Sequence, residues 1–311
     1  MQQEKILVTG ANGQIGSVLT LALRARYGNE NVIATDIRQL TDNQHFALVN
    51  ILDAYQLVEI VKKHSITQIY HLAAILSAKG EADPVGTWDI NMSGLFNVLN
   101  TAKEYGVKKV FFPSSIAVFG RNAAKEHTSQ NEICCPETVY GISKVAGENW
   151  CNYYFLKYGL DVRSLRYPGI IGHQTLPGGG TTDYAVEIYH KALKNEIFSC
   201  FLNATTRLPM IYMDDAIRAT LEIMDADAAK IKIRTSYNLA GMSFAPKDVF
   251  EAIKTHQPDF QISYQPDFRQ AIADSWTSSI DDSAARNDWG WNAKFDLKSM
   301  TDDMLKHLKN K

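Results

Sequence analysis

The sequence predicts an α/β fold, a doubly wound and mostly parallel sheet with a smaller C-terminal lobe. Short apolar runs alternate with stretches of helical apolar spacing along the first half of the chain, as in repeated strand–helix–strand units. A glycine-rich turn joins the first apolar run to the first helical stretch. The 311 residues are 45% hydrophobic and 21% charged, which is typical of a globular core and excludes a disordered or collagen-like chain.

The first two elements have the clearest patterns. The run from Lys5 to Thr9 is almost continuously apolar, which indicates a strand buried on both faces, and it ends at Gly10. Apolar residues between Ile15 and Leu23 then recur at helical spacing, and Tyr27-Gly28 is a suitable end for the helix. We expect the alternation to continue with strands at 31–35, 46–49, 68–72 and 109–112 and with helices at 54–63 and 88–105.

The second half of the chain is less regular. Its patterns predict helices at 139–158, 184–194 and 214–224 and strands at 161–166 and 236–239. From Gly169 onward the spacing loosens, and Pro177 precedes three consecutive glycines. We interpret this loosening as the start of a substrate-binding lobe.

Charge and motif content exclude several classes of ligand. With 32 Lys and Arg against 34 Asp and Glu, the net charge of −2 gives no basic field for nucleic acid. No apolar run approaches the roughly 18 residues of a membrane span, and the polar segment Met1–Lys5 does not resemble an export signal. The four cysteines include no C-x-x-C, and the eight histidines include no H-E-x-x-H. We therefore expect a cytoplasmic protein with free thiols and no metal, and we expect neither nucleic acid nor membrane as a partner.

The glycine turn suits a dinucleotide. Gly10, Gly13 and Gly16 stand between the predicted strand and helix, where backbone N–H groups and the helix N-terminus can contact a pyrophosphate. Their spacing differs from the usual G-x-G-x-x-G, so the position of the turn between a strand and a helix is stronger evidence than the motif itself. The alternative to a dinucleotide site is that these glycines serve only the packing of the turn. The residues of this turn that we assign to the cofactor are Gly10, Asn12, Gly13, Gln14, Ile15 and Gly16.

Asp36 ends the second predicted strand, 26 residues after Gly10. A carboxylate at this place accepts hydrogen bonds from ribose hydroxyls and repels a 2'-phosphate, which favours NAD over NADP. Arg38 would partly offset that repulsion. We assign Asp36, Ile37 and Arg38 to the cofactor. Asn50 and Ile51, directly after the third strand, are candidates for an adenine pocket, with an unrelated polar loop as the alternative.

A combination of Ser, Tyr and Lys can carry the chemistry. Tyr140 and Lys144 are four residues apart and share one face of their predicted helix. An ammonium and a positively charged nicotinamide both favour the phenolate, so that Tyr140 can remove a hydroxyl proton. Ser114 and Ser115 follow the strand that ends at Phe112, at the edge where open α/β sheets bind ligands. Ser115 can hydrogen-bond the reacting oxygen, unless it only caps the turn.

Together these features resemble the extended short-chain dehydrogenase/reductase family over nearly the whole chain. The resemblance is carried by the glycine turn, His71-Leu-Ala-Ala74, Asn91, Ser115, Tyr140 and Lys144. It implies a Rossmann-type sheet with NAD across its C-terminal edge and Tyr140, Lys144 and Ser115 as catalytic residues. The further cofactor contacts that it implies are Leu72, Ala73, Ala74, Asn91, Tyr140, Lys144, Tyr167 and Pro168. We expect an NAD-binding domain at 1–168 and an interleaved substrate-binding lobe at 169–311, with the strand near 236–240 returning to the first domain.

Members of this family catalyse different reactions. Its sugar-nucleotide dehydratases carry an Asp-Glu pair where this chain has Ile116 and Ala117, so we do not expect dehydration. A UDP-sugar 4-epimerase is the main alternative, because five C-terminal arginines could hold a diphosphate. These are Arg207, Arg218, Arg234, Arg269 and Arg286. A non-catalytic NAD-sensing module is a remote alternative, since it would not need the Ser, Tyr and Lys set.

Several C-terminal segments resemble the L-threonine 3-dehydrogenases of this family. They are Pro177–Ala185, Leu208–Asp215, Tyr237–Ser243 and Pro266–Trp276 with Trp289-Gly-Trp291. This implies metal-independent oxidation of the L-threonine 3-hydroxyl by NAD to 2-amino-3-oxobutanoate and NADH, in threonine catabolism. The residues expected near the substrate are Ser77, Ser114, Ser115, Tyr140, Gly179, Gly180, Thr181, Thr182 and Trp276, with Asp183 or Asp215 as partner of its ammonium group. Because family members commonly dimerise through the helices predicted at 88–105 and 139–158, we expect a homodimer.

Overall fold

A seven-stranded parallel sheet forms the centre of the molecule. The computed structural model describes residues 4–39, 45–178 and 180–310. The strands follow the order β10-β6-β5-β4-β1-β2-β3, so that the direction of winding reverses beside β1. Their bounds are β1 Ile6–Thr9, β2 Val32–Asp36, β3 Phe46–Leu48, β4 Gln68–His71, β5 Lys109–Ser115, β6 Asp161–Tyr167 and β10 Tyr237–Asn238. The predicted doubly wound α/β fold is confirmed, and β10 pairs with β6 in the central sheet.

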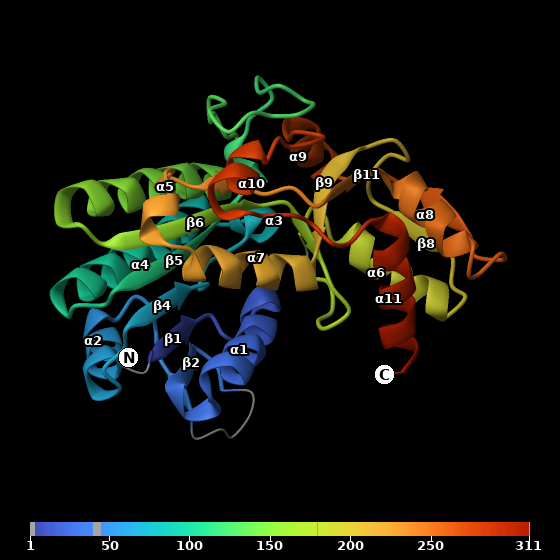
Figure 1. Ribbon diagram of the computed structural model, residues 1–311. Helices are drawn as coiled ribbons and strands as arrows, with labels where there is room; N and C mark the ends of the chain where they lie inside the picture. The colour runs from blue at the N-terminus through green and yellow to red at the C-terminus, as the bar shows by residue number, and fades with distance from the viewer. Residues whose placement is uncertain (1–3, 40–44, 179, 311) are drawn as a thin grey trace.

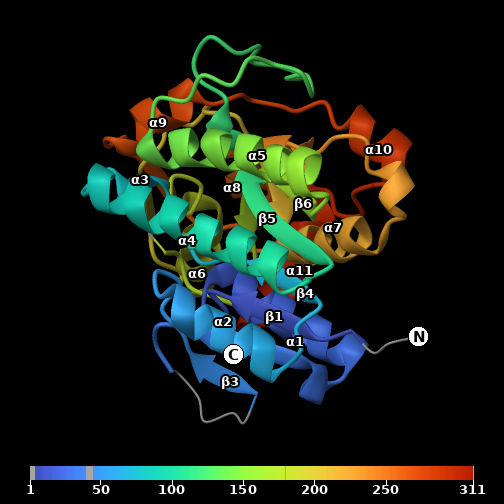
Figure 2. The same ribbon diagram turned by 90° about the vertical axis from the view of Figure 1, so that its left-hand side faces the viewer.

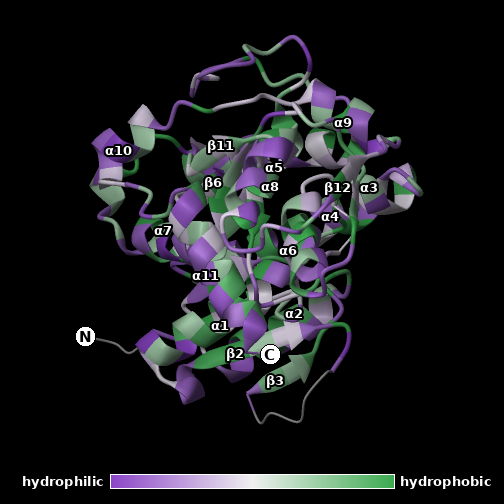
Figure 3. Ribbon diagram, turned by 90° about the vertical axis from the view of Figure 1, so that its right-hand side faces the viewer, coloured by the Kyte–Doolittle hydropathy of each residue, from purple (hydrophilic) through white to green (hydrophobic). Residues whose placement is uncertain are grey.

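Helices cover both faces of this sheet, as Figures 1 and 2 show. Ile6 and Val8 of β1 belong to one buried cluster, whereas Leu7 between them belongs to another, because successive side chains of a strand point to opposite faces. The first cluster contains residues of α1 and α7, and the second contains residues of α2, α4 and α5. The helix bounds are α1 Gln14–Tyr27, α2 Ala54–Lys63, α4 Pro84–Glu104, α5 Val139–Tyr158 and α7 Met213–Asp225. In Figure 3 the labelled strand β2 is green, whereas α1 beside it mixes green and purple, as expected of an amphipathic helix on a buried sheet.

The smaller lobe lies on the right in Figure 1 and has two short sheets. One has the order β11-β9-β7, and the other pairs β12 with β8. The strand bounds are β7 Gly169–Ile171, β8 Phe198–Cys200, β9 Leu208–Tyr212, β11 Met242–Phe244 and β12 Ile262–Tyr264. Its helices are α6 Tyr184–Leu193, α8 Pro246–Lys254, α9 Arg269–Ser275 and α11 Leu297–Lys309. Of the two remaining short helices, α3 Ser77–Gly80 lies against α5, and α10 Ser283–Trp289 lies beside β10 of the central sheet. No helix among the described residues is long and apolar enough to cross a membrane.

Several predicted bounds need correction. The second strand begins at Val32 and not at Asn31, because Asn29–Asn31 form a 3-10 turn. The fourth helix begins four residues before Trp88, where the Asp83 carboxylate accepts a hydrogen bond from the Gly86 N–H at 3.0 Å. The strand predicted to end at Phe112 continues to Ser115, because its pairing with β6 runs to Tyr167. The strands β7, β8, β9, β11 and β12 and the helices α3, α8, α9, α10 and α11 were not predicted.

Candidate active site

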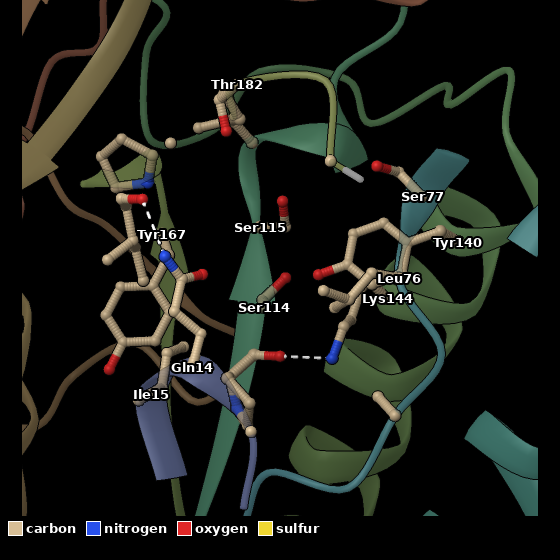
Figure 4. A pocket seen from close by; sticks show the side chains of 18 of the residues that line it. Gln14, Ile15, Leu76, Ser77, Ser114, Ser115, Tyr140, Lys144, Tyr167 and Thr182 are labelled. Carbon is tan, nitrogen blue, oxygen red and sulfur yellow. Dashed lines mark hydrogen bonds between the residues drawn. The ribbon is translucent and has the colours of Figure 1, made fainter. Parts of the chain in front are cut away.

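A cavity opens at the carboxyl edge of the central sheet, beside the point where the winding reverses (Figure 4). The predicted cofactor or substrate residues that line it are Gly10, Gly13, Gln14, Ile15, Gly16, Leu72, Ala74, Ser77, Ser114, Ser115, Tyr140, Lys144, Tyr167, Pro168, Gly180, Thr181, Thr182 and Trp276. Those that do not line it are Asn12, Asp36, Ile37, Arg38, Asn50, Ile51, Ala73 and Asn91. Gly179 lies outside the described residues. Leu76, Pro113, Ile116, Gly169 and Ile170 line the cavity without having been predicted, and only their sequence neighbourhood to predicted residues could have indicated them.

The glycine turn has the shape that a dinucleotide requires. Gly10 has φ of 67°, and a Cβ atom on it would lie 2.6 Å from the backbone nitrogen of Ala73. A Cβ atom on Gly16 would lie 2.2 Å from the carbonyl oxygen of Gly10. No side chain caps the N-terminus of α1 at Gly13, so the first N–H groups of this helix can receive an anion. The turn therefore fits the pyrophosphate of a dinucleotide.

Asp36 lies at the carboxyl end of β2, next to the glycine turn. Its carboxylate accepts hydrogen bonds from the backbone N–H groups of Asn12 at 3.1 Å and Arg38 at 3.3 Å. The Asn12 side chain donates to the carbonyl oxygen of Arg38 at 2.5 Å. These contacts hold the Asp36 carboxylate beside the turn, where it is available to ribose hydroxyls.

The other residues predicted for the cofactor lie deeper or further along the edge. Ile51 is buried in the hydrophobic cluster under α2 and α4, and the Asn50 side chain accepts a hydrogen bond from the Leu52 N–H at 3.0 Å. Asn91 and Ala73 line a second, small cavity that Lys144 and Ala74 share with the main one.

The Asn91 side chain connects neighbouring segments at the small cavity. Its amide bonds both the N–H and the carbonyl of Ile75, at 2.8 and 3.1 Å, and donates to the Ser143 hydroxyl at 3.2 Å. It thereby ties the segment after β4, which lines the cavity, to α5. His71 in the same small cavity bonds the Thr9 hydroxyl at 3.0 Å, and burial lowers the pKa of its imidazole to about 3. His71 is therefore neutral at physiological pH.

Tyr140 and Lys144 project from α5 toward the end of β5 (Figure 4). The Lys144 Nζ donates to the Pro113 carbonyl at 2.7 Å and lies 5.4 Å from the centre of the Tyr140 ring. Burial raises the pKa of Tyr140 to about 12, against the lowering effect of a hydrogen bond with Ser115. Burial also lowers the pKa of Lys144 to about 8. At neutral pH the pair in the free protein is therefore a phenol beside an ammonium group.

The two serines of β5 have different partners. The Ser115 hydroxyl accepts a hydrogen bond from the Ala117 N–H at 3.2 Å, so it caps the 3-10 turn as well as contacting Tyr140. The Ser114 hydroxyl donates to the Glu148 carboxylate at 2.5 Å. Both serines line the cavity. Ser115, which contacts Tyr140, is the one whose hydroxyl can hydrogen-bond the same substrate oxygen as Tyr140.

The opposite wall comes from the loop before α6 and from Trp276. Thr181 is buried, and its hydroxyl has no hydrogen-bond partner among the described residues. The Gly180 N–H donates to the Asp183 carboxylate at 2.7 Å, and Asp183 also lines the cavity. Asp215, in contrast, lies outside the cavity, where it pairs with Arg218 at 2.7 Å. Of the two carboxylates predicted for an ammonium group, only Asp183 is therefore in place.

The five C-terminal arginines considered for a diphosphate do not line the cavity. Each instead pairs with a carboxylate of the chain at 2.5–2.7 Å. The pairs are Arg207–Asp248, Arg218–Asp215, Arg234–Asp161, Arg269–Asp267 and Arg286–Asp282. Lys144 is the one cationic side chain among the described residues that line the cavity.

The thiols, and the cluster of possible metal ligands found among the described residues, lie away from the cavity. All four cysteines are free. Within the described ranges, His173, Asp303 and His307 bring possible metal ligands within 4.8 Å of one another, and none of the three lines the cavity. The expectation that the reaction needs no metal stays a prediction.

Comparison with known proteins places this chain in one family. The model of the NAD dependent epimerase/dehydratase family matches residues 6–240. An uncharacterized epimerase/dehydratase of Staphylococcus haemolyticus is 46% identical over 314 residues, covering 99% of this chain and 98% of the relative. The solved holo form of a GalE-like L-threonine dehydrogenase from Cupriavidus necator is 54% identical, with a TM-score of 0.96 over 98% of this chain and 99% of that one. A monomeric L-threonine 3-dehydrogenase from a metagenome is 50% identical, also with a TM-score of 0.96 and the same coverage. The chain thus belongs to the NAD dependent epimerase/dehydratase family.

Proposed function

We propose that this chain is an NAD-dependent L-threonine 3-dehydrogenase that converts L-threonine to 2-amino-3-oxobutanoate. The observation that carries the proposal is that Tyr140 contacts Ser115 beside Lys144 in the wall of the cavity that also contains the glycine turn. A dinucleotide on that turn and a small alcohol against Tyr140 would share this cavity. Two similar solved structures are L-threonine dehydrogenases, which supports the choice of substrate.

The residues take distinct roles in this reaction. The turn of Gly10, Gly13 and Gly16 would hold the pyrophosphate and Asp36 the adenosine ribose, and bound NAD supplies the hydride acceptor. Tyr140, as phenolate, removes the proton of the substrate 3-hydroxyl while the hydrogen on C3 leaves with its electron pair, so that a carbonyl group forms. Ser115 donates a hydrogen bond to the substrate oxygen, and the Lys144 ammonium favours the phenolate and contacts the cofactor ribose.

The substrate groups remote from the reacting carbon have candidate partners as well. The Thr181 hydroxyl and the backbone around Gly180 would bind the carboxylate, and Asp183 would attract the ammonium group. Ser77, Thr182 and Trp276 complete the wall around the substrate.

The epimerase alternative fits the cavity less well. A UDP-sugar epimerase must bind a diphosphate, which ordinarily needs arginine or lysine at the sugar-nucleotide end of the site. The five candidate arginines are paired with carboxylates outside the cavity. A free zwitterionic amino acid has no such requirement.

A direct assay tests the proposed function. Purified protein with NAD and L-threonine should release NADH in proportion to the threonine consumed, and L-allo-threonine, which has the opposite configuration at C3, should react much more slowly. An epimerase would instead retain its cofactor through turnover. Absence of NADH with L-threonine, together with interconversion of UDP-glucose and UDP-galactose, would refute the proposal.

We also propose that the protein acts as a homodimer in the cytoplasm, in threonine catabolism. Helix α5 exposes Trp150, Tyr153, Leu156 and Tyr158, of which Leu156 is 73% exposed, and such an apolar face suits a second copy of the chain. One similar structure is described as monomeric, so the state must be measured. Sedimentation equilibrium should give twice the chain mass, and Leu156→Glu should halve it. A wild-type mass of one chain would contradict the dimer.

A further inference from the structure

A buried ion pair lies behind the cavity wall, between α5 and β6. Glu148 is 3% exposed and Arg166 is 5% exposed, and neither lines the cavity. The arginine donates from Nε and Nη2 to the two carboxylate oxygens, at 2.9 and 2.8 Å. This bidentate geometry fixes both side chains. The roles proposed above for the cavity residues do not use the pair.

On one side, the Glu148 carboxylate holds the strand that carries the reactive groups. It accepts the hydrogen bond from Ser114, whose two neighbours on β5 are Pro113 and Ser115. The Pro113 carbonyl is the acceptor for Lys144, and the Ser115 hydroxyl contacts Tyr140. Glu148 follows Lys144 by four residues and therefore shares its face of α5. The Glu148 carboxylate thus joins the helix to the strand beside the reacting groups.

On the other side, Arg166 ties the pair to a segment that lies outside the cavity wall. Its Nη1 atom donates to the Gln130 carbonyl at 3.1 Å and to the Asn238 side chain at 3.2 Å. The Asn238 amide in turn donates to the Thr128 carbonyl at 3.1 Å. These contacts hold the segment around residue 128, part of the green loop at the top of Figure 1, against the central sheet. That segment is bonded to the stretch after Trp276, because the Lys125 Nζ donates to the Trp276 carbonyl at 2.8 Å.

We propose that Glu148, held by Arg166, is a positioning residue that sets Ser115 on β5 against Tyr140 and Lys144 on α5. This inference rests on the proposed dehydrogenase function. An ion pair in this place is not needed for packing alone, since apolar side chains of similar volume often replace a buried pair at no cost in stability. A misplacement of about 1 Å between reacting groups can lower a rate by about a hundredfold, so a device that fixes their spacing has a clear use.

The charge of Glu148 has a second, measurable consequence. The titratable groups around Lys144 are Tyr140, Glu148 and Cys151 on α5 and His71 on β4. Burial raises the pKa values of Tyr140 and Cys151 and lowers that of His71, so all three are neutral between pH 6 and 9. Burial holds the pKa of Lys144 down at about 8, and the negative charge of Glu148 opposes this. Removal of the Glu148 charge must therefore lower the pH at which Lys144 loses its proton.

The test compares Glu148→Gln with Asp161→Asn. Asp161 pairs with the buried Arg163 at the other end of β6, at 2.7 Å, and serves as a matched control for the loss of a carboxylate beside a buried arginine. We expect both variants to melt at lower temperature. Only Glu148→Gln should lower kcat for L-threonine, by about ten- to a hundredfold, with KM nearly unchanged. Ser114→Ala breaks the contact to the strand and keeps the charge, so it should also lower kcat but leave the pH at which Lys144 loses its proton unchanged.

A readout without substrate separates this inference from the proposed function. If Lys144 contacts the cofactor ribose, NADH affinity should weaken as the pH rises and Lys144 loses its proton. The pH at which the affinity falls should be lower in Glu148→Gln and should return toward the wild-type value in Glu148→Asp. If the wild-type protein does not oxidise L-threonine but its NADH affinity shows this pH dependence, only the proposed dehydrogenase function is refuted. If Glu148→Gln does not fold, the double variant Glu148→Met with Arg166→Met leaves no unpaired charge, and it should fold with low kcat. Equal kcat in wild type and in Glu148→Gln or the double variant would overturn the positioning role.

Discussion

Replacement of Tyr140 by phenylalanine should lower the rate of NADH formation from L-threonine by about 10²–10⁴-fold, the usual contribution of a general base. The change removes one oxygen atom from a partly buried ring and leaves its packing against Lys144 in place. NAD binding, followed by calorimetry, should persist, because the glycine turn and Asp36 lie apart from this hydroxyl. The loss should appear in kcat, since the phenolate acts in the chemical step.

The pH dependence gives this prediction a second check. Because burial holds the pKa of Tyr140 at about 12, the group is a protonated phenol at neutral pH and acts as a base only after losing that proton. The wild-type kcat should therefore rise with pH, whereas the residual rate of Tyr140→Phe should not. Tyr184→Phe is the matched control, since that hydroxyl is also buried, has no hydrogen-bond partner among the described residues and does not line the cavity. A Tyr140→Phe variant as active as Tyr184→Phe would exclude Tyr140 as the base.

Replacement of Asp36 by alanine should narrow the preference for NAD over NADP by about ten- to a hundredfold in kcat/KM. A hydrogen bond to a charged group contributes about 1.5–3 kcal/mol, and each 1.4 kcal/mol corresponds to about a tenfold change. Asp36 offers such bonds to the ribose hydroxyls and opposes a 2'-phosphate by its charge. Its carboxylate is already oriented by the N–H groups of Asn12 and Arg38. The measurement is kcat/KM for each cofactor at saturating L-threonine.

Arg38→Ala serves as the paired control for cofactor choice. Arg38 lies two residues from Asp36 and is exposed, so its positive charge would partly offset the repulsion of a phosphate. Its removal should widen the preference for NAD, in the direction opposite to Asp36→Ala. If Asp36→Ala leaves the ratio unchanged and Arg38→Ala alters it, the choice of cofactor depends on Arg38 and not on Asp36.

The central sheet and its main helices could be predicted because their signals are local. The prediction for α5 agrees with its bounds at both ends, since Thr138 caps the first turn through the Gly141 N–H at 3.1 Å and Gly159 ends the helix with φ of 70°. Strand β1 was equally clear, because both of its faces are buried and its run is almost continuously apolar. The division into domains at residue 168 stays a prediction.

The short strands of the second lobe could not be predicted in the same way. Strand β7 has three residues, and its pairing of Gly169 with Met210 joins segments far apart in the sequence. So few residues carry no measurable periodicity, and the partner strand decides whether they become a strand at all. The polar end of β5 was missed for the same reason, since Ser114 and Ser115 extend that strand only by pairing with β6.

By itself, the sequence determined the doubly wound sheet, the glycine turn and the helix that carries Tyr140 and Lys144, because apolar spacing, caps and glycine positions act over a few residues. Only the tertiary structure decided which charged side chains line the cavity. In the folded chain Asp183 lines the cavity, whereas Asp215 lies outside it and pairs with Arg218. The five arginines pair with carboxylates, and Glu148 pairs with Arg166 behind strand β5. The physical reason is that a buried charge needs a partner. That partner comes from whichever segment the fold packs against it, and no local pattern records the choice.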